Sequence, residues 1–343
     1  MTAVASIRRG LGGRGRISLL LAVVAVVFLV VLPYLGASRF MLHVAGLTFI
    51  WIVVASYWNL LNGYAGILSL GNLGFFALGA YISSVLAKEL GISPWITIWI
   101  GAAATMAIVT VLVGLPVLRL RGIYIALLTL VFADALPSIV TILRTWTGGG
   151  TGLLGIPEFL PNLEKWQSYY ITLGFAVVAM IVLYRIVHGT TGMVFVALRD
   201  SEDFAVALGV SRFRQGLKVF AISAFVTGLA GGFFAHTLGQ ISPGMLGIDQ
   251  FLTVVAMWLL GGAGTFLGPI LGAFVVTVGN EYLRVAGSLR LGLLGGLIVL
   301  TVLLFPGGIM QLVDRGVAIV TRLAGRTGPD GKDRPADATR EGG

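Results

Sequence analysis

Few residues of this 343-residue chain have side chains and spacings suited to chemistry. The sole Gly-Lys pair, Gly331-Lys332, is followed by Asp333, whereas a phosphate-binding loop needs Gly-Lys-Ser/Thr at the start of a helix. No G-x-S-x-G motif occurs, and the chain has no cysteine. The histidines lie far apart and lack metal-ligand spacing: His43, His188 and His236. We therefore expect no catalytic residue, no metal site and no cofactor in this chain.

Asp134, in the apolar segment LVFADALPSI, is the clearest candidate for an ionisable group inside a membrane. One interpretation is that it borders a polar pathway or braces a broken helix near Pro137. The other is that it lies close enough to the outer interface to be hydrated. A single buried acid is thin support for coupling to an ion gradient, which usually uses several ionisable groups.

A polar island of 28 residues, Gly189–Gly216, interrupts the apolar sequence. Ser201 is a good helix N-cap, Glu202 and Asp203 suit the positive end of a helix dipole, and Gly209 can end the helix in a left-handed conformation. Four small or apolar residues fall on one face at helical spacing: Phe204, Ala205, Ala207 and Leu208. The island predicts a short amphipathic helix that a soluble partner can approach closely.

The elements that must position these residues are membrane-spanning helices. The chain is 57% hydrophobic and 11% charged, with recurring apolar runs close to the roughly 20 residues that cross a bilayer. Such uninterrupted runs exclude a β-barrel, whose strands alternate over about ten residues. The fold class is therefore an all-α polytopic membrane protein. The net charge of +9 reflects membrane topology and not nucleic-acid binding.

We expect about ten spans, with eight as the alternative. The first is too long for a signal peptide and is read as retained. Seventeen basic residues fall inside and six outside, which places both termini in the cytoplasm. A basic N-terminus (1–16) precedes a membrane domain (17–310), and a disordered tail (311–343) follows. The predicted spans are 17–35, 40–61, 65–87, 94–116, 122–143, 169–188, 217–239, 250–263, 265–283 and 290–306.

Two apolar segments rich in glycine, 62–79 and 261–272, predict broken helices. Broken backbone survives at membrane depth only where protein or a wet cavity surrounds it. The segments resemble each other loosely, which suggests an internal duplication, although generic helix packing explains the glycines equally well. Asn62 and Asn72 lie in the first segment and could bind a substrate or bond to a neighbouring helix.

Several segments together resemble the permeases of bacterial ATP-binding-cassette importers for branched-chain amino acids, specifically the LivM-type member of the LivH/LivM pair. The resemblance extends over about residues 55 to 310. The segments that carry it are Asn59-Leu60-Leu61-Asn62-Gly63-Tyr64-Ala65-Gly66, Ser69-Leu70-Gly71, Phe75-Phe76-Ala77-Leu78-Gly79-Ala80-Tyr81, Arg121-Gly122-Ile123-Tyr124, Thr147-Gly148-Gly149 with Gly152, Gly155-Ile156-Pro157, Ala207-Leu208-Gly209, and Gly261-Gly262 through Gly268-Pro269.

The resemblance implies a permease in the bacterial inner membrane that has no enzymatic activity of its own. Its partners would be a LivH-type permease, two cytoplasmic ATPases that bind ATP and Mg, and a periplasmic or lipid-anchored binding protein. The island would be the coupling loop (189–216). Its ATPase-coupling residues would be Arg199, Asp200, Ser201, Glu202, Asp203, Ala205, Ala207 and Gly209.

Two departures from the family pattern bear on the substrate. Asn72 stands where histidine is common, and Asp134 stands where glutamate is common. We expect leucine, isoleucine and valine as substrates. Urea, short amides or other amino acids are the alternatives within the same architecture, and an ion-coupled transporter is the alternative outside it. The translocation pathway is expected to include Asn62, Asn72 and Asp134.

Overall fold

The computed structural model describes residues 24–283, apart from positions 25, 37, 118, 121 and 161–163, together with a few isolated positions beyond 283. The long helices are α2 (Arg39–Asn59), α3 (Asn72–Glu89), α4 (Pro94–Ile108), α6 (Ile123–Ile142), α8 (Lys165–Val187), α11 (Arg212–Leu238), α12 (Ile248–Gly261) and α13 (Gly268–Tyr282). The short elements are η1 (Leu32–Leu35), η2 (Leu60–Tyr64), η3 (Val109–Gly114), α5 (Leu115–Val117), α7 (Arg144–Thr147), η4 (Gly149–Thr151), β1 (Leu153–Leu154), α9 (Thr190–Asp200), α10 (Glu202–Ala207), β2 (Gln240–Ile241) and η5 (Pro243–Leu246).

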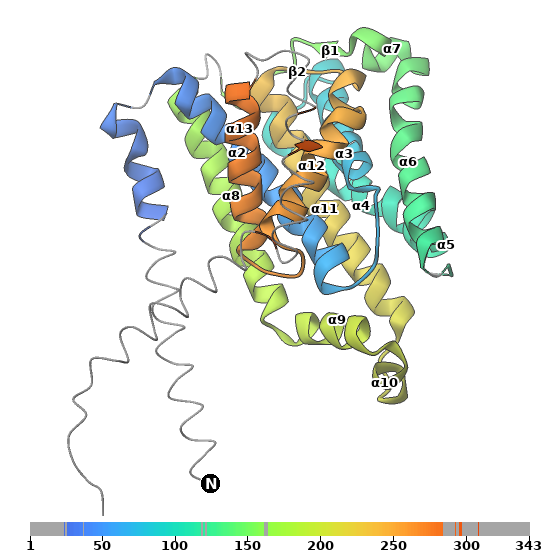
Figure 1. The fold of residues 1–343 in the computed structure, drawn as a ribbon. Helices are drawn as coiled ribbons and strands as arrows, with labels where there is room; N and C mark the ends of the chain where they lie inside the picture. The colour runs from blue at the N-terminus through green and yellow to red at the C-terminus, as the bar shows by residue number, and fades with distance from the viewer. Residues whose placement is uncertain are drawn as a thin grey trace, which may run out of the picture.

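The helices form one bundle, in which α11 packs against α2, α3 and α4 (Figure 1). Close backbone contact between α3 and α11 depends on glycine. A Cβ added at Gly231 would collide with the carbonyl oxygen of Phe76, and one at Gly79 would collide with the carbonyl of Gly228. Small residues at helix crossings are the usual way to bring membrane helices together.

The two glycine-rich segments do break the helices. α2 ends in a five-residue π-helix, η2, and the chain from Ala65 to Gly71 is not helical before α3 begins. A second break, residues 262–267, separates α12 from α13. Gly272 and Gly261 allow α12 and α13 to cross tightly, because a Cβ at either glycine would overlap backbone atoms of the other helix. The predicted continuous span 65–87 is thus shortened to α3.

The two ends of the bundle differ (Figure 1). At one end, β1 pairs antiparallel with β2, with Leu153 opposite Ile241 and Leu154 opposite Gln240. At the opposite end, α9 and α10 project beyond the long helices. At this end the chain runs from α8 into α9 and from α10 into α11. The polar island is therefore held between two long helices.

Six helices of the described part are long and apolar enough to cross a membrane, and the chain is accordingly a membrane protein. They are Arg39–Tyr64, Pro94–Val117, Ile123–Ile142, Lys165–Val187, Arg212–Leu238 and Pro243–Gly261. The expected total of about ten stays a prediction. The basic N-terminus (1–16) and the tail (311–343) lie outside the described residues, as do most of the spans 17–35 and 290–306.

Candidate functional site

The polar island folds into two short helices, α9 and α10, joined at Ser201. Ser201 has extended backbone and begins α10, but its side chain makes no capping bond, contrary to the expected N-cap role. Gly209 ends the helix as predicted, with φ +89°. Its N–H bonds Val206 O at 2.9 Å, and the N–H of Val210 bonds Ala205 O at 3.1 Å. This pair of bonds is a Schellman motif, which favours glycine at the left-handed position.

The outer surface of α10 is apolar and exposed. Phe204 is 66% exposed and Leu208 is 70% exposed. Ala207 is exposed beside them, whereas Ala205 is 2% exposed and faces the protein, so the four residues do not share one face as expected. Contiguous exposed apolar side chains at a polar end of the molecule mark a surface suited to a protein partner.

Contacts on the inner side fix α9 and α10 to the bundle. Phe195 of α9 is buried. The guanidinium Nε of Arg212 lies 3.4 Å from the Glu202 carboxylate, and its Nη2 donates to the carbonyl of Leu120 at 3.4 Å. Glu202 therefore links α10 to the start of α11 and, through Arg212, to the segment before α6.

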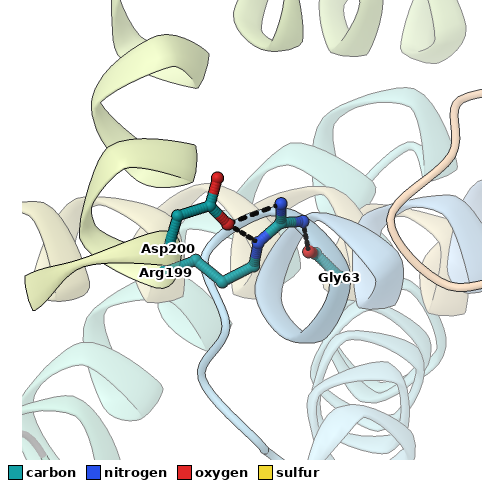
Figure 2. Close-up of polar contacts among 3 residues, drawn as sticks. All are labelled: Gly63, Arg199 and Asp200. Atoms are coloured by element: carbon teal, nitrogen blue, oxygen red, sulfur yellow. Dashed lines mark hydrogen bonds and ion pairs between the residues drawn. The ribbon is translucent and has the colours of Figure 1, made fainter.

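Arg199 connects this surface to the first helix break. Its Nη1 donates to the carbonyl oxygen of Gly63 in η2 at 2.7 Å (Figure 2). Asp200 holds the same guanidinium, since its Oδ1 lies 2.9 Å from Nε and 2.8 Å from Nη2. η2 ends at Tyr64, so the Gly63 carbonyl has no helical N–H after it from which to accept a hydrogen bond. A charged donor at this carbonyl therefore stabilises the break.

Glycines on both breaks make room for the Arg199 side chain. A Cβ at Gly66, which has φ +67°, would lie 2.5 Å from Arg199 Cγ. A Cβ at Gly264 would lie 3.3 Å from Arg199 Nη1. Arg199 therefore contacts segments that precede α3 and α13, far apart in the sequence, while its side chain stays 35% exposed.

Asn59, at the end of α2, joins the two breaks directly. Its Oδ1 accepts from Gly264 N–H at 2.8 Å and from Trp258 Nε1 at 3.0 Å, and its Nδ2 donates to Thr265 O at 2.8 Å. The side chain is 1% exposed, and these partners give it three hydrogen bonds inside the protein. The look-alike segments around Asn59 and Gly264 are in contact, which sequence similarity alone does not reveal.

Asn62 and Asn72 both form hydrogen bonds with other residues of this chain in this conformation. Asn62 closes the loop before α3, accepting from Ser69 N–H at 3.0 Å and donating to Ser69 O at 3.2 Å. Asn72 is 1% exposed, donates to Val54 O at 3.3 Å and accepts from Thr227 at 3.3 Å. Their predicted place in a pathway stays a prediction.

Asp134 lies on an exposed face of α6, eight residues from the C-terminal end of the helix. Eight residues correspond to about 12 Å, which is well inside a hydrocarbon core of about 30 Å. Within the described part no hydrogen bond or ion pair is recorded for it, and its neighbours on the same stripe are Val131 and Ser138, both exposed. The predicted place of Asp134 in a translocation pathway stays a prediction.

Groups suited to metal binding do not gather anywhere in the described residues. The buried His236 is engaged at the end of the bundle opposite α9. One ring nitrogen lies 2.8 Å from Ser83 Oγ, and the other lies 2.6 Å from the carbonyl of Pro157. This histidine ties the loop after β1 to α3 and α11.

Comparison with known proteins places these features in context. Residues 40–303 match the family described as branched-chain amino acid transport system / permease component. The permease LivM of Escherichia coli (strain K12) is 31% identical over 85% of this chain and 75% of its own length. LivM of Salmonella typhimurium is 31% identical over 80% and 71%, respectively. The autoinducer 2 import system permease LsrC of Enterobacter sp. is 29% identical over 70% and 77%. No solved structure matches the chain.

Proposed function

Because this chain belongs to the branched-chain amino acid transport permease family, we propose that it is the permease subunit of an ATP-binding-cassette importer. It moves leucine, isoleucine and valine across the bacterial inner membrane. The observation that carries this proposal is the 31% identity to LivM over 85% of the chain. The partners are a second, LivH-type permease, two ATPases that bind ATP and Mg, and a periplasmic or lipid-anchored binding protein. Both termini are cytoplasmic.

The α9–α10 surface is the coupling element of this proposal. Its exposed Phe204 and Leu208 supply an apolar contact for an ATPase. Arg199 supplies the inward connection, because it contacts the backbone of the first break. Closure of the ATPases would move α10, and the hydrogen bond between Arg199 and Gly63 would carry this movement to the first helix break. The movement favours one of two arrangements of the spans.

Reconstitution tests the function. The chain, its partner permease, the ATPases and the binding protein, placed together in proteoliposomes, should accumulate radiolabelled leucine when ATP is supplied. Unlabelled isoleucine and valine should compete, whereas urea and acetamide should not. The chain alone should accumulate nothing, and a protonophore should not abolish uptake by the complex. Gradient-driven uptake by the chain alone would contradict the proposal.

Asp134 belongs, in this proposal, to the surface that α6 presents to the second permease and to the pathway between them. A carboxylate in mid-membrane is strongly disfavoured against lipid. We expect Asp134→Asn to lower the maximal rate of uptake about tenfold while the complex still assembles. Ser138→Ala, one turn along the same face, is the matched control and should keep most activity. Wild-type uptake by Asp134→Asn would remove Asp134 from the pathway.

A further inference from the structure

A long apolar groove runs along the outside of the bundle between α4, α8 and α11. Its volume is about 690 Å³, within the roughly 300–1,000 Å³ typical of small-molecule sites. Its walls are large apolar side chains: Trp99, Met106, Val178, Val182, Ile222 and Phe225. Along α11 it extends from Lys218 to Phe233, which is about 22 Å of helix. The groove therefore covers most of the thickness of a bilayer core.

The lining fits lipid chains better than another helix. Membrane helices associate through small residues, and Ala221 is the one small residue of α11 that lines the groove. Gly228, Gly231 and Gly232 face Thr105, Phe76 and Ile98 inside the bundle. The groove walls are instead mostly large apolar side chains. Gly174 opens the floor, because a Cβ built there meets nothing within 4 Å.

The two ends of the groove differ in charge. Lys218 lies at the end where α9 is found, Arg214 precedes it by one turn of α11, and Arg185 follows Val182 by three residues on α8. All three are exposed, and no side-chain hydrogen bond or ion pair is recorded for them in the described part. Trp95 and Tyr170 line the opposite end, as aromatic residues do at membrane interfaces. Clustered cations beside an apolar groove favour an anionic headgroup.

We propose that this groove is a binding site for an anionic phospholipid. The phosphate lies at Lys218, with Arg214 and Arg185 contributing to its binding, and the acyl chains lie along α8 and α11. This site is separate from the amino acid pathway and does not depend on the proposed substrate. It would make the permease responsive to the anionic lipid content of the membrane.

Native mass spectrometry of the purified full-length chain tests the proposal, with dioleoyl phosphatidylglycerol or dioleoyl phosphatidylcholine added to the micelles. Phosphatidylglycerol should be retained in preference to phosphatidylcholine. Lys218→Gln should lower the retention of phosphatidylglycerol about fivefold and leave phosphatidylcholine unchanged. Gly174→Leu, which fills the floor of the groove, should lower the retention of both lipids.

Matched controls are available in the same chain. Lys165→Gln removes a cation at the opposite end of α8, and Gly279→Leu adds the same side chain at an open position of α13. Both should retain lipid as the wild type does. Equal retention of phosphatidylglycerol by wild type, Lys218→Gln and Gly174→Leu would overturn the proposal. So would loss of the second permease from the complex in Gly174→Leu, together with photo-cross-linking to that subunit from a benzophenone maleimide attached to the thiol of Val178→Cys, since the groove would then be a protein interface.

Discussion

Replacing Arg199 with glutamine should uncouple ATP hydrolysis from transport. The wild-type guanidinium bonds the Gly63 carbonyl and is held by Asp200, so it connects α9 directly to the first helix break. A hydrogen bond to a charged group contributes about 1.5–3 kcal/mol, which corresponds to roughly a tenfold to hundredfold change in an equilibrium. The amount of leucine moved per ATP hydrolysed should fall by about that factor, while the ATPase activity of the complex persists.

The measurement is the ratio of leucine uptake to phosphate release in proteoliposomes. Arg199→Lys should give an intermediate ratio, because an ammonium group cannot span Asp200 and Gly63 as the planar guanidinium does. Arg119→Gln is the matched control, since it removes an exposed cation that lies outside the polar island and makes no side-chain hydrogen bond or ion pair among the described residues. A wild-type ratio in Arg199→Gln would show that the coupling path runs elsewhere, for example through Glu202 and Arg212.

Replacing Gly231 with leucine should prevent the chain from folding. The added side chain would meet the carbonyl of Phe76 at the crossing of α3 and α11, and rigid backbone cannot move aside as a flexible side chain can. Overpacking costs about 1–3 kcal/mol where side chains yield, and we expect at least the upper value here. Purified yield, elution as a single species and thermal unfolding in detergent would report the loss.

Gly279→Leu provides the comparison, because it adds the same side chain where a Cβ meets no atom within 4 Å. It should express and unfold as the wild type does. If Gly231→Leu were equally stable, α3 and α11 could not approach as closely as the structure shows.

Structural features that depend on local sequence could be predicted from the sequence alone. Runs of apolar residues predicted membrane helices, and glycine clusters predicted breaks near Gly63 and Gly262. Gly209 was predicted to end α10 because its left-handed conformation is a local property. The function was predicted from the resemblance to the permease family, and the family match over residues 40–303 supports that prediction.

Other features depend on contacts between residues distant in the sequence. The sequence predicts Arg199 as a coupling residue, but its contact with Gly63 spans 136 positions and has no local signal. Asn59 was not selected as a site residue, because its role requires α12 and α13 to fold back beside α2. Ala205 and Phe204 looked equivalent on a helical projection, whereas the position of the bundle buries one and exposes the other.

The three hydrogen bonds of Asn59 have a mechanical consequence. They attach the turn after α12 to the last residue of α2, with one bond to Gly264 N–H and another to Thr265 O, in opposite senses. While those bonds persist, the helix break after α2 and the turn after α12 cannot move independently of each other. The two interruptions are therefore expected to move as one unit, so that any rearrangement of the helix break after α2 involves the turn after α12 as well.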